Sequence, residues 1–328
     1  MGFRQYGAVV TALIMLGLLM GACSVGSGTP PPSPPPQVPV AESLYIHTTS
    51  ATAVQSAACN VATTFKGSTN GAFVILDFGD ATSVGQVSYG LDLNAAAVEF
   101  IVEAFAAYYH NCSSTNDPSL ILGIGEDNAN DFGGNPNGAG STLADEVNTV
   151  NNYLTPLDYV PLVNATGAVD AEPSYGSVPE IQSWAAGFES VGTASWSDFG
   201  SADGCPTSGS GTNGPCNNGW KEDDLYQISY GDSGASTPLP EIYATDEANA
   251  DQWAQIAWYG GNTYSKTELF GGPFTEYQAC LQRGGCSGIN NSPAAAWSQL
   301  WTAVNNIPAI SSTAAFDFGY SCDIEWLN

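Results

Sequence analysis

Short apolar runs alternate with helical patterns along residues 43–328, and this alternation constrains the fold more than any other feature of the chain. The run AFVILDF at residues 72–78 is apolar at every position except Asp77, which is typical of a parallel strand covered on both faces. Further strands are expected at residues 44–48, 120–125, 160–171, 195–199, 225–230, 239–243 and 267–270. Strands that alternate with helices favour a parallel sheet with right-handed crossovers.

Between these runs, apolar residues recur at the spacing of a helix with one buried face. The clearest pattern spans residues 94–111, and its apolar positions are Val98, Ile101, Val102, Phe105 and Tyr109. Similar patterns predict helices within residues 54–65, 143–154, 178–188, 253–257 and 297–304. About eight strands alternating with helices predict an α/β fold of the (β/α)8 TIM-barrel type, with a doubly wound open sheet as the alternative. No G-x-G-x-x-G follows the first strand, so dinucleotide binding is disfavoured and no cofactor is expected.

The N-terminus has the features of a targeting segment. Arg4 precedes an apolar run at residues 8–20, which is too short to span a bilayer and is typical of a signal peptide. The run ends in Met20-Gly21-Ala22-Cys23, which resembles the lipobox of bacterial lipoproteins. That resemblance implies a signal peptide at residues 1–22 and a lipid on the Cys23 thiol; an ordinary secretory signal with an incidental cysteine is the alternative.

Residues 23–42 contain two proline triplets and predict an extended spacer without a core of its own. The folded domain is therefore expected at residues 43–328, held clear of a bacterial membrane by its lipid anchor. We expect an extracellular monomer.

The chain is strongly acidic, with 5 Lys and Arg against 32 Asp and Glu and a net charge of −27. This balance excludes nucleic acid as a partner, because there is no cationic surface to neutralise phosphates. It excludes a polybasic contact with anionic lipid for the same reason. Carboxylates that repel one another at neutral pH predict an acid-tolerant protein. Composition bias of the source lineage is the alternative interpretation.

Cysteines outside the cytoplasm are expected to form disulfides. Besides Cys23, the chain has seven cysteines, and their positions suggest the pairs Cys205–Cys216, Cys280–Cys286 and Cys59–Cys112, with Cys322 left over. Zinc is disfavoured because no pair has the C-x2-C spacing and the chain has only two His. We therefore expect no metal.

Acidic residues follow several of the expected strands, where a barrel carries its chemistry. The sequence Asp170-Ala171-Glu172 is the most informative, because residues two apart on a strand point the same way, roughly 6.6 Å apart. Two carboxylates held this close do not ionise independently, and one pKa rises. A carboxyl group with a raised pKa can protonate a leaving oxygen near neutral pH. Strand-end acids that only cap the next helix are the alternative.

A barrel with D-x-E at the end of its fourth strand resembles the family 25 lysozymes and the family 18 chitinases. The resemblance implies that Glu172 is the general acid and that Asp170 orients the N-acetyl group of the substrate. The chain departs from the chitinase pattern at Ala165 and Ala168, where that family has two further Asp. FVILDFGD, FGSADGCP…CNNGW and PLPEIY resemble a group of secreted bacterial proteins with no assigned activity.

Other strand-end residues are expected to line the same cleft and bind substrate. They are Asp77, Glu126, Asp198, Glu241, Tyr243 and Trp220. The predicted function is that of a glycoside-hydrolase-like protein acting on a cell-wall or environmental polysaccharide. A non-catalytic carbohydrate-binding or surface-organising module on the same barrel is the alternative.

Overall fold

The computed structural model describes residues 33–328 apart from 84–85, 89–90, 115–116, 160–161 and 312–317. The expected signal peptide and Cys23 lie outside these residues, which all belong to one compact unit. No helix in the described part of the chain is both long enough and apolar enough to cross a bilayer.

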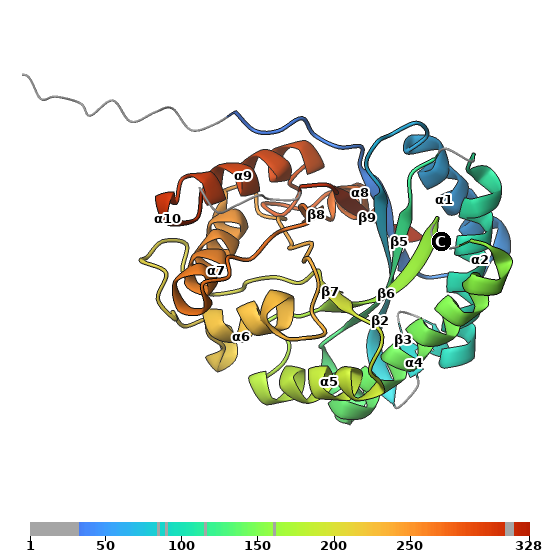
Figure 1. The fold of residues 1–328 in the computed structure, drawn as a ribbon, viewed down its shortest axis with the longest axis horizontal. Helices are drawn as coiled ribbons and strands as arrows, with labels where there is room; N and C mark the ends of the chain where they lie inside the picture. Colours follow the sequence, from blue (N-terminus) through green and yellow to red (C-terminus); the bar gives the residue numbers. More distant parts are fainter. Residues whose placement is uncertain (1–32, 84–85, 89–90, 115–116, 160–161, 312–317) are drawn as a thin grey trace, which may run out of the picture. The chain divides into compact units, whose positions relative to one another are not determined.

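Seven parallel strands form a curled sheet inside a layer of helices (Figure 1). The strands are β1 (Ala41–Ile46), β2 (Ala72–Ser83), β5 (Leu120–Asp127), β6 (Val163–Asp170), β7 (Trp196–Asp198), β8 (Phe274–Thr275) and β9 (Cys322–Leu327). Their order in the sheet is β7-β6-β5-β2-β1-β9-β8. Two short strands pair with the end of β2 in antiparallel fashion: β3 (Gln86–Ser88) pairs with β2, and β4 (Asp92–Asn94) pairs with β3.

An irregular segment at residues 234–242 bridges the two edge strands of this sheet. On one side the amide of Leu239 donates to the carbonyl of Asp198 at 2.8 Å; on the other side the amide of Phe274 donates to the carbonyl of Pro240 at 2.9 Å. Pro238 and Pro240 have no N–H, so the ladder on the β8 side is incomplete. With this segment as the sixth of eight positions, the strands close into a ring that resembles a (β/α)8 barrel.

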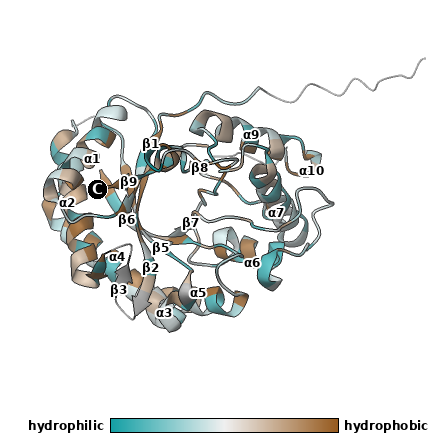
Figure 2. Cartoon of the chain, turned by 180° about the vertical axis from the view of Figure 1, so that it is seen from behind, coloured by the Kyte–Doolittle hydropathy of each residue, from teal (hydrophilic) through white to brown (hydrophobic). Residues whose placement is uncertain are grey.

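Helices connect the strands and cover the outside of the ring. They are α1 (Ala51–Thr64), α2 (Ala95–Cys112), α3 (Asn130–Gly134), α4 (Pro136–Leu154), α5 (Val178–Val191), α6 (Glu222–Tyr226), α7 (Ala248–Tyr264), α8 (Tyr277–Gln282), α9 (Pro293–Asn305) and α10 (Pro308–Ser311). Figure 2 shows hydrophilic and hydrophobic residues mixed along these helices, as expected for helices with one buried face.

Local sequence explains where the regular helices begin. The side chain of Asn94 accepts a hydrogen bond from the amide of Ala97 at 3.0 Å and so caps α2. Asn135 caps α4 in the same way, through the amide of Gly138. The expected apolar face of α2 is buried, which confirms the helical pattern read from residues 94–111.

The structure contains the three expected disulfides. Cys59–Cys112 joins α1 to α2, Cys205–Cys216 closes a loop after β7, and Cys280–Cys286 closes a loop after β8. Cys322 is buried and free on β9. Three disulfides are consistent with an oxidising, extracellular environment.

The expected strand at residues 225–230 is wrong, because this segment is helical. It spans α6 and the π-helix η3 (Gln227–Gly231). Leu225 and Ile228 are three residues apart and both buried, as on one face of a helix. The hydroxyl of Ser229 donates to the carbonyl of Leu225 at 2.7 Å, a bond between successive turns.

The expected strand at residues 267–270 is also wrong, since the seventh position of the ring is β8, four residues later. The eighth position is β9, which the sequence analysis did not predict. Its burial is continuous only from Cys322 to Ile324, and acids at Asp323 and Glu325 interrupt the apolar run. The remaining expected strands match β1, β2, β5, β6, β7 and the irregular segment.

Candidate functional site

A pocket of about 410 Å³ opens where the carboxyl ends of the strands meet. Parallel strands deliver the residues that follow them to one face of the ring, which is where barrels carry their sites. The acidic residues that line the pocket are Asp77, Asp80, Asp127, Asp170, Glu172, Glu241 and Glu276. They come from β2, β5, β6, the irregular segment and the residue that follows β8.

Three of these carboxylates form a tight cluster. Asp170, Glu172 and Glu241 each place a carboxylate oxygen within 4.8 Å of the other two. Burial and the neighbouring acids raise the pKa of Asp170 and of Glu241 well above the ordinary range. Because like charges at this distance repel, the cluster retains protons at neutral pH.

Glu172 has the pKa best suited to proton transfer within this cluster. Burial raises its pKa to about 7, and the charges of neighbouring acids act in the same direction. A carboxyl group with such a pKa is partly protonated at neutral pH and can donate its proton to a leaving oxygen. The amide side chain of Asn128 donates to the backbone carbonyl of Glu172 at 3.0 Å and fixes the chain there.

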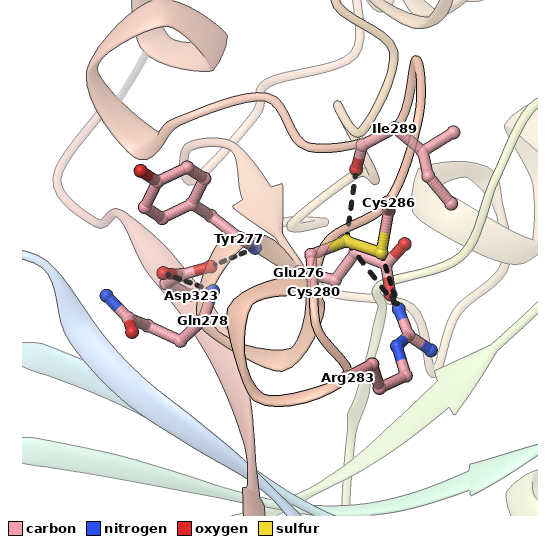
Figure 3. The surroundings of a disulfide bond; sticks show 8 residues. All are labelled: Glu276, Tyr277, Gln278, Cys280, Arg283, Cys286, Ile289 and Asp323. Atoms are coloured by element: carbon pink, nitrogen blue, oxygen red, sulfur yellow. Dashed lines mark hydrogen bonds and ion pairs between the residues drawn. A yellow bond between two sulfur atoms is a disulfide. The ribbon is translucent and has the colours of Figure 1, made fainter.

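Glu276 differs from the cluster because it has a basic partner. It is 5% exposed, and the guanidinium of Arg283 forms an ion pair with it (Figure 3). Burial raises the pKa of Glu276, and the charge of Arg283 acts in the opposite direction. Arg283 lies in the loop closed by Cys280–Cys286, and its Nη2 lies 3.3 Å from the sulfur of Cys286.

A second acidic group lies beside the cluster, on β2 and β5. Burial raises the pKa of Asp77 to about 7, although its side chain accepts a hydrogen bond from the amide of Gly79 at 2.8 Å. Burial, a hydrogen bond with Asp80 and the charge of Asp77 raise the pKa of Asp127 to about 9. This side of the pocket therefore also holds protons at neutral pH.

The rim of the pocket carries apolar and aromatic groups. Tyr175 follows β6 and is 61% exposed, and Ile289 is 44% exposed. Tyr45 and Tyr243 line the pocket more deeply. An exposed aromatic ring beside a polar pocket can pack against the apolar face of a ligand.

Five residues expected from the sequence line this pocket together: Asp77, Asp170, Glu172, Glu241 and Tyr243. The other three are buried outside its lining. Glu126 accepts a hydrogen bond from the indole of Trp184, and the indole of Trp220 donates to the carbonyl of Gly176 at 2.9 Å. Trp220 is fully buried, so its ring has no free face for a sugar.

Asp198 is the third of these residues, and its hydrogen bonds hold the backbone beside the site. Its carboxylate accepts hydrogen bonds from the amide of Gly200 at 3.0 Å and from the amide of Ala171 at 3.3 Å. Ala171 lies between Asp170 and Glu172, so this contact fixes the backbone that carries both. Burial raises the pKa of Asp198 to about 7.

Glu276, Arg283 and Tyr175 were not among the expected site residues. Glu276 directly follows two buried residues, Phe274 and Thr275, and an acid after a buried strand was the signal used elsewhere. It was missed because the strand was expected at residues 267–270.

Among the residues that the structure describes, two groups of side chains have ligand atoms close enough for a metal ion. The cluster of Asp170, Glu172 and Glu241 offers oxygens, which suit hard cations such as Ca²⁺. Glu276, Cys280 and Cys286 also lie close together, but both sulfurs are in a disulfide and have no thiolate to offer.

No known family model matches the sequence, and no curated protein matches it. Among solved structures, the chain is similar to the endo-beta-1,4-mannanase from Thermotoga petrophila, with 12% sequence identity and a TM-score of 0.44. The match covers 89% of this chain and 68% of that one. A likeness at this level does not identify a family.

Proposed function

We propose that this chain is a lipid-anchored extracellular glycoside hydrolase that acts on a polysaccharide, with Glu172 as its general acid. The observation that carries the proposal is the position of Glu172, a carboxyl group with a pKa of about 7 in an open pocket lined by further carboxylates. Glycoside hydrolysis needs such an acid to protonate the leaving oxygen and a second carboxylate on the other side of the bond.

Glu276 is the best candidate for the second carboxylate. The reaction develops positive charge on the sugar ring, so the second group must be ionised. Arg283 favours the ionised form of Glu276, whereas neighbouring acids favour the protonated form of Glu241. Asp170 then serves as the positioning partner of Glu172, and Asp77 and Glu241 line the cleft.

The openness of the pocket favours an enzyme over a non-catalytic binding module. An open pocket admits a polysaccharide to Glu172, whereas a mouth filled by side chains would not. The loop closed by Cys205–Cys216 contributes no residue to the pocket lining, so it does not fill the mouth.

The test is release of reducing ends by the full chain between about pH 3 and about pH 9 on peptidoglycan, chitin, chitosan and neutral α- and β-glycans. We expect activity on at least one of them, and its loss in Glu172→Gln. Asp145→Asn removes an exposed carboxylate on α4, outside the pocket lining, and serves as the matched control. No cleavage by a folded protein, combined with binding to a glycan, would support the binding module instead.

A further inference from the structure

We propose that the pocket selects a polysaccharide of amino sugars whose amines are free and protonated. The proposal rests on the proposed function, because it names the substrate class of the same site. It is carried by the charge of the pocket lining and by two buried acceptors that have no partner.

The charge of the lining is one-sided. Its seven acids face a single base, Arg283, which is already paired with Glu276. A glycan with uronate, sulfate or phosphate groups would add negative charge to a lining whose acids already hold protons because they repel one another, so it is disfavoured. A protonated amine would instead act as a counter-ion between the acids of the cluster, so that they release their protons and ionise when it binds.

Two acceptors in the lining are buried and unpaired in the described part of the chain. They are the carbonyl oxygen Oδ1 of the Asn128 side chain and Oδ1 of Asp170. Asn128 is 1% exposed, and its other side-chain atom, the amide nitrogen, already donates to Glu172. A buried acceptor without a donor costs free energy, so the ligand that completes this site must supply donors.

An ammonium group fits this requirement, because it carries three donors and one positive charge. Asp170 contributes both an unpaired acceptor and a member of the three-carboxylate cluster. One amine can therefore donate hydrogen bonds to the unpaired oxygens and form ion pairs with the cluster at the same time. A neutral hydroxyl offers one donor and supplies no positive charge that would let the acids ionise.

The size and rim of the pocket favour a sugar over a bare cation. Calcium sites in proteins enclose the ion in six to eight oxygens. Here the cluster opens into a volume of about 410 Å³, within the range of small-molecule sites. Tyr175 adds an exposed ring on which the apolar face of a sugar can pack.

The first test compares hexamers of glucosamine, N-acetylglucosamine, glucose and galacturonate by calorimetry with the full chain at about pH 5.5. We expect glucosamine to bind about tenfold tighter than glucose and galacturonate to bind most weakly. The cluster is protonated when empty, so binding of the amine should release protons, seen as a dependence of the heat on the buffer. Equal affinity for the glucosamine and glucose hexamers would overturn the proposal.

Two further measurements protect the test against a misfolded variant. Asp170→Asn should remove the preference for glucosamine, whereas Asp145→Asn should keep it. In the wild-type protein, the preference should shrink as NaCl rises from about 50 mM to about 500 mM. A preference that is independent of salt would contradict recognition by charge.

Separate outcomes distinguish this proposal from the proposed function. Binding of glucosamine oligomers without cleavage of any glycan would refute the hydrolase and leave amine recognition standing. Cleavage of a neutral glycan without preference for glucosamine would refute amine recognition and leave the hydrolase standing. Binding of Ca²⁺ alone that blocks the sugar would show a metal site and overturn the amine proposal.

Discussion

The two halves of the ring are built differently. The strands β1, β2, β5 and β6 have 6, 12, 8 and 8 residues, and parallel ladders join them, with a register shift between β2 and β5. In the other half, β7 has 3 residues and β8 has 2, with an irregular, proline-containing segment between them. We call these the regular half and the irregular half.

The irregular half is held together by side chains where the backbone ladder is short. The hydroxyl of Thr275 donates to the carboxylate of Asp323 at 2.9 Å. The amide of Tyr277 donates to the same carboxylate at 2.7 Å, as Figure 3 shows. Two of the three disulfides also lie in this half. The candidate site draws on both halves, because Glu172 follows β6 and Glu276 follows β8.

The largest expected effect tests whether each half supplies a catalytic carboxyl group. Glu172→Gln and Glu276→Gln should each lower kcat by about 10²- to 10⁴-fold. In the wild-type protein, kcat/KM should fall as pH rises through about 7, because Glu172 acts in its protonated form. Steady-state kinetics across pH measures both effects. Full activity in Glu276→Gln would show that the irregular half lines the pocket without supplying a catalytic group.

The next effect concerns the disulfides, one from each half. Cys59–Cys112 encloses a separation of 53 residues, and its removal with serines should cost about 4 kcal/mol of stability. Cys280–Cys286 has a sequence separation of 6, and its removal should cost about 2 kcal/mol. Only the second change frees the loop of Arg283, so only it should lower kcat/KM. Thermal melts and kinetics of both variants provide the test, and a loss of activity without Cys59–Cys112 would contradict it.

The regular half was easier to predict from the sequence than the irregular half. The largely apolar runs at residues 72–78 and 120–125 predicted β2 and β5, because a strand buried on both faces reads as a nearly continuous apolar run. Asp170 and Glu172 were found because they lie at the end of the strand expected at residues 160–171, although Asn164 and Thr166 make that strand less apolar. The position of β8 was not predictable from pattern, because two residues show no period.

Tertiary context accounts for the other errors. The segment LYQISY at residues 225–230 reads equally as a short strand or a buried helix, and the acids of the first turn, beginning at Glu222, favour the helix. Glu126 and Asp198 follow strands like the pocket acids, yet the side chain of each is buried with protein donors. Sequence places such acids at strand ends and does not distinguish the mouth of the pocket from the layer beneath it.

The joint between the halves gives the third prediction. A Cβ at Gly200 would lie 2.4 Å from the carbonyl oxygen of Ala171 and 2.5 Å from its nitrogen. Gly200→Ala should therefore cost about 1–3 kcal/mol and displace the backbone between Asp170 and Glu172, lowering kcat. Gly209→Ala is the matched control, because its Cβ would meet only a glutamine side chain, at 3.3 Å. Equal melting temperatures for the two variants would contradict this account.

Buried acids give the fourth prediction, with Glu146 in α4 representing the regular half. Burial, with the charges of Glu126 and Glu99, raises the pKa of Glu146 to about 9. Because its pKa in the folded protein lies above the unfolded value, this group contributes stability at low pH that is lost as pH rises toward 9.

Glu146→Gln should match the wild type near pH 5 and melt about 2 °C higher near pH 9. Glu268→Gln makes the same test in the irregular half, where Glu268 is fully buried against Ser229. Melting temperatures of the wild type and both variants, measured across pH, provide the test. A wild-type protein that melts lower as pH falls from 7 to 5 would contradict the raised pKa values of both halves.

The smallest effect concerns the rim, where Tyr175 follows β6 and Ile289 belongs to the irregular half. An aromatic ring packed on a sugar contributes about 1 kcal/mol, so Tyr175→Ala should raise KM about fivefold and leave kcat unchanged. Tyr175→Phe keeps the ring and should retain the wild-type KM. Ile289→Ala removes a smaller apolar group and should change KM less than about twofold. If Ile289→Ala had the larger effect, the irregular half would carry the binding face, and the regular half would supply the acid alone.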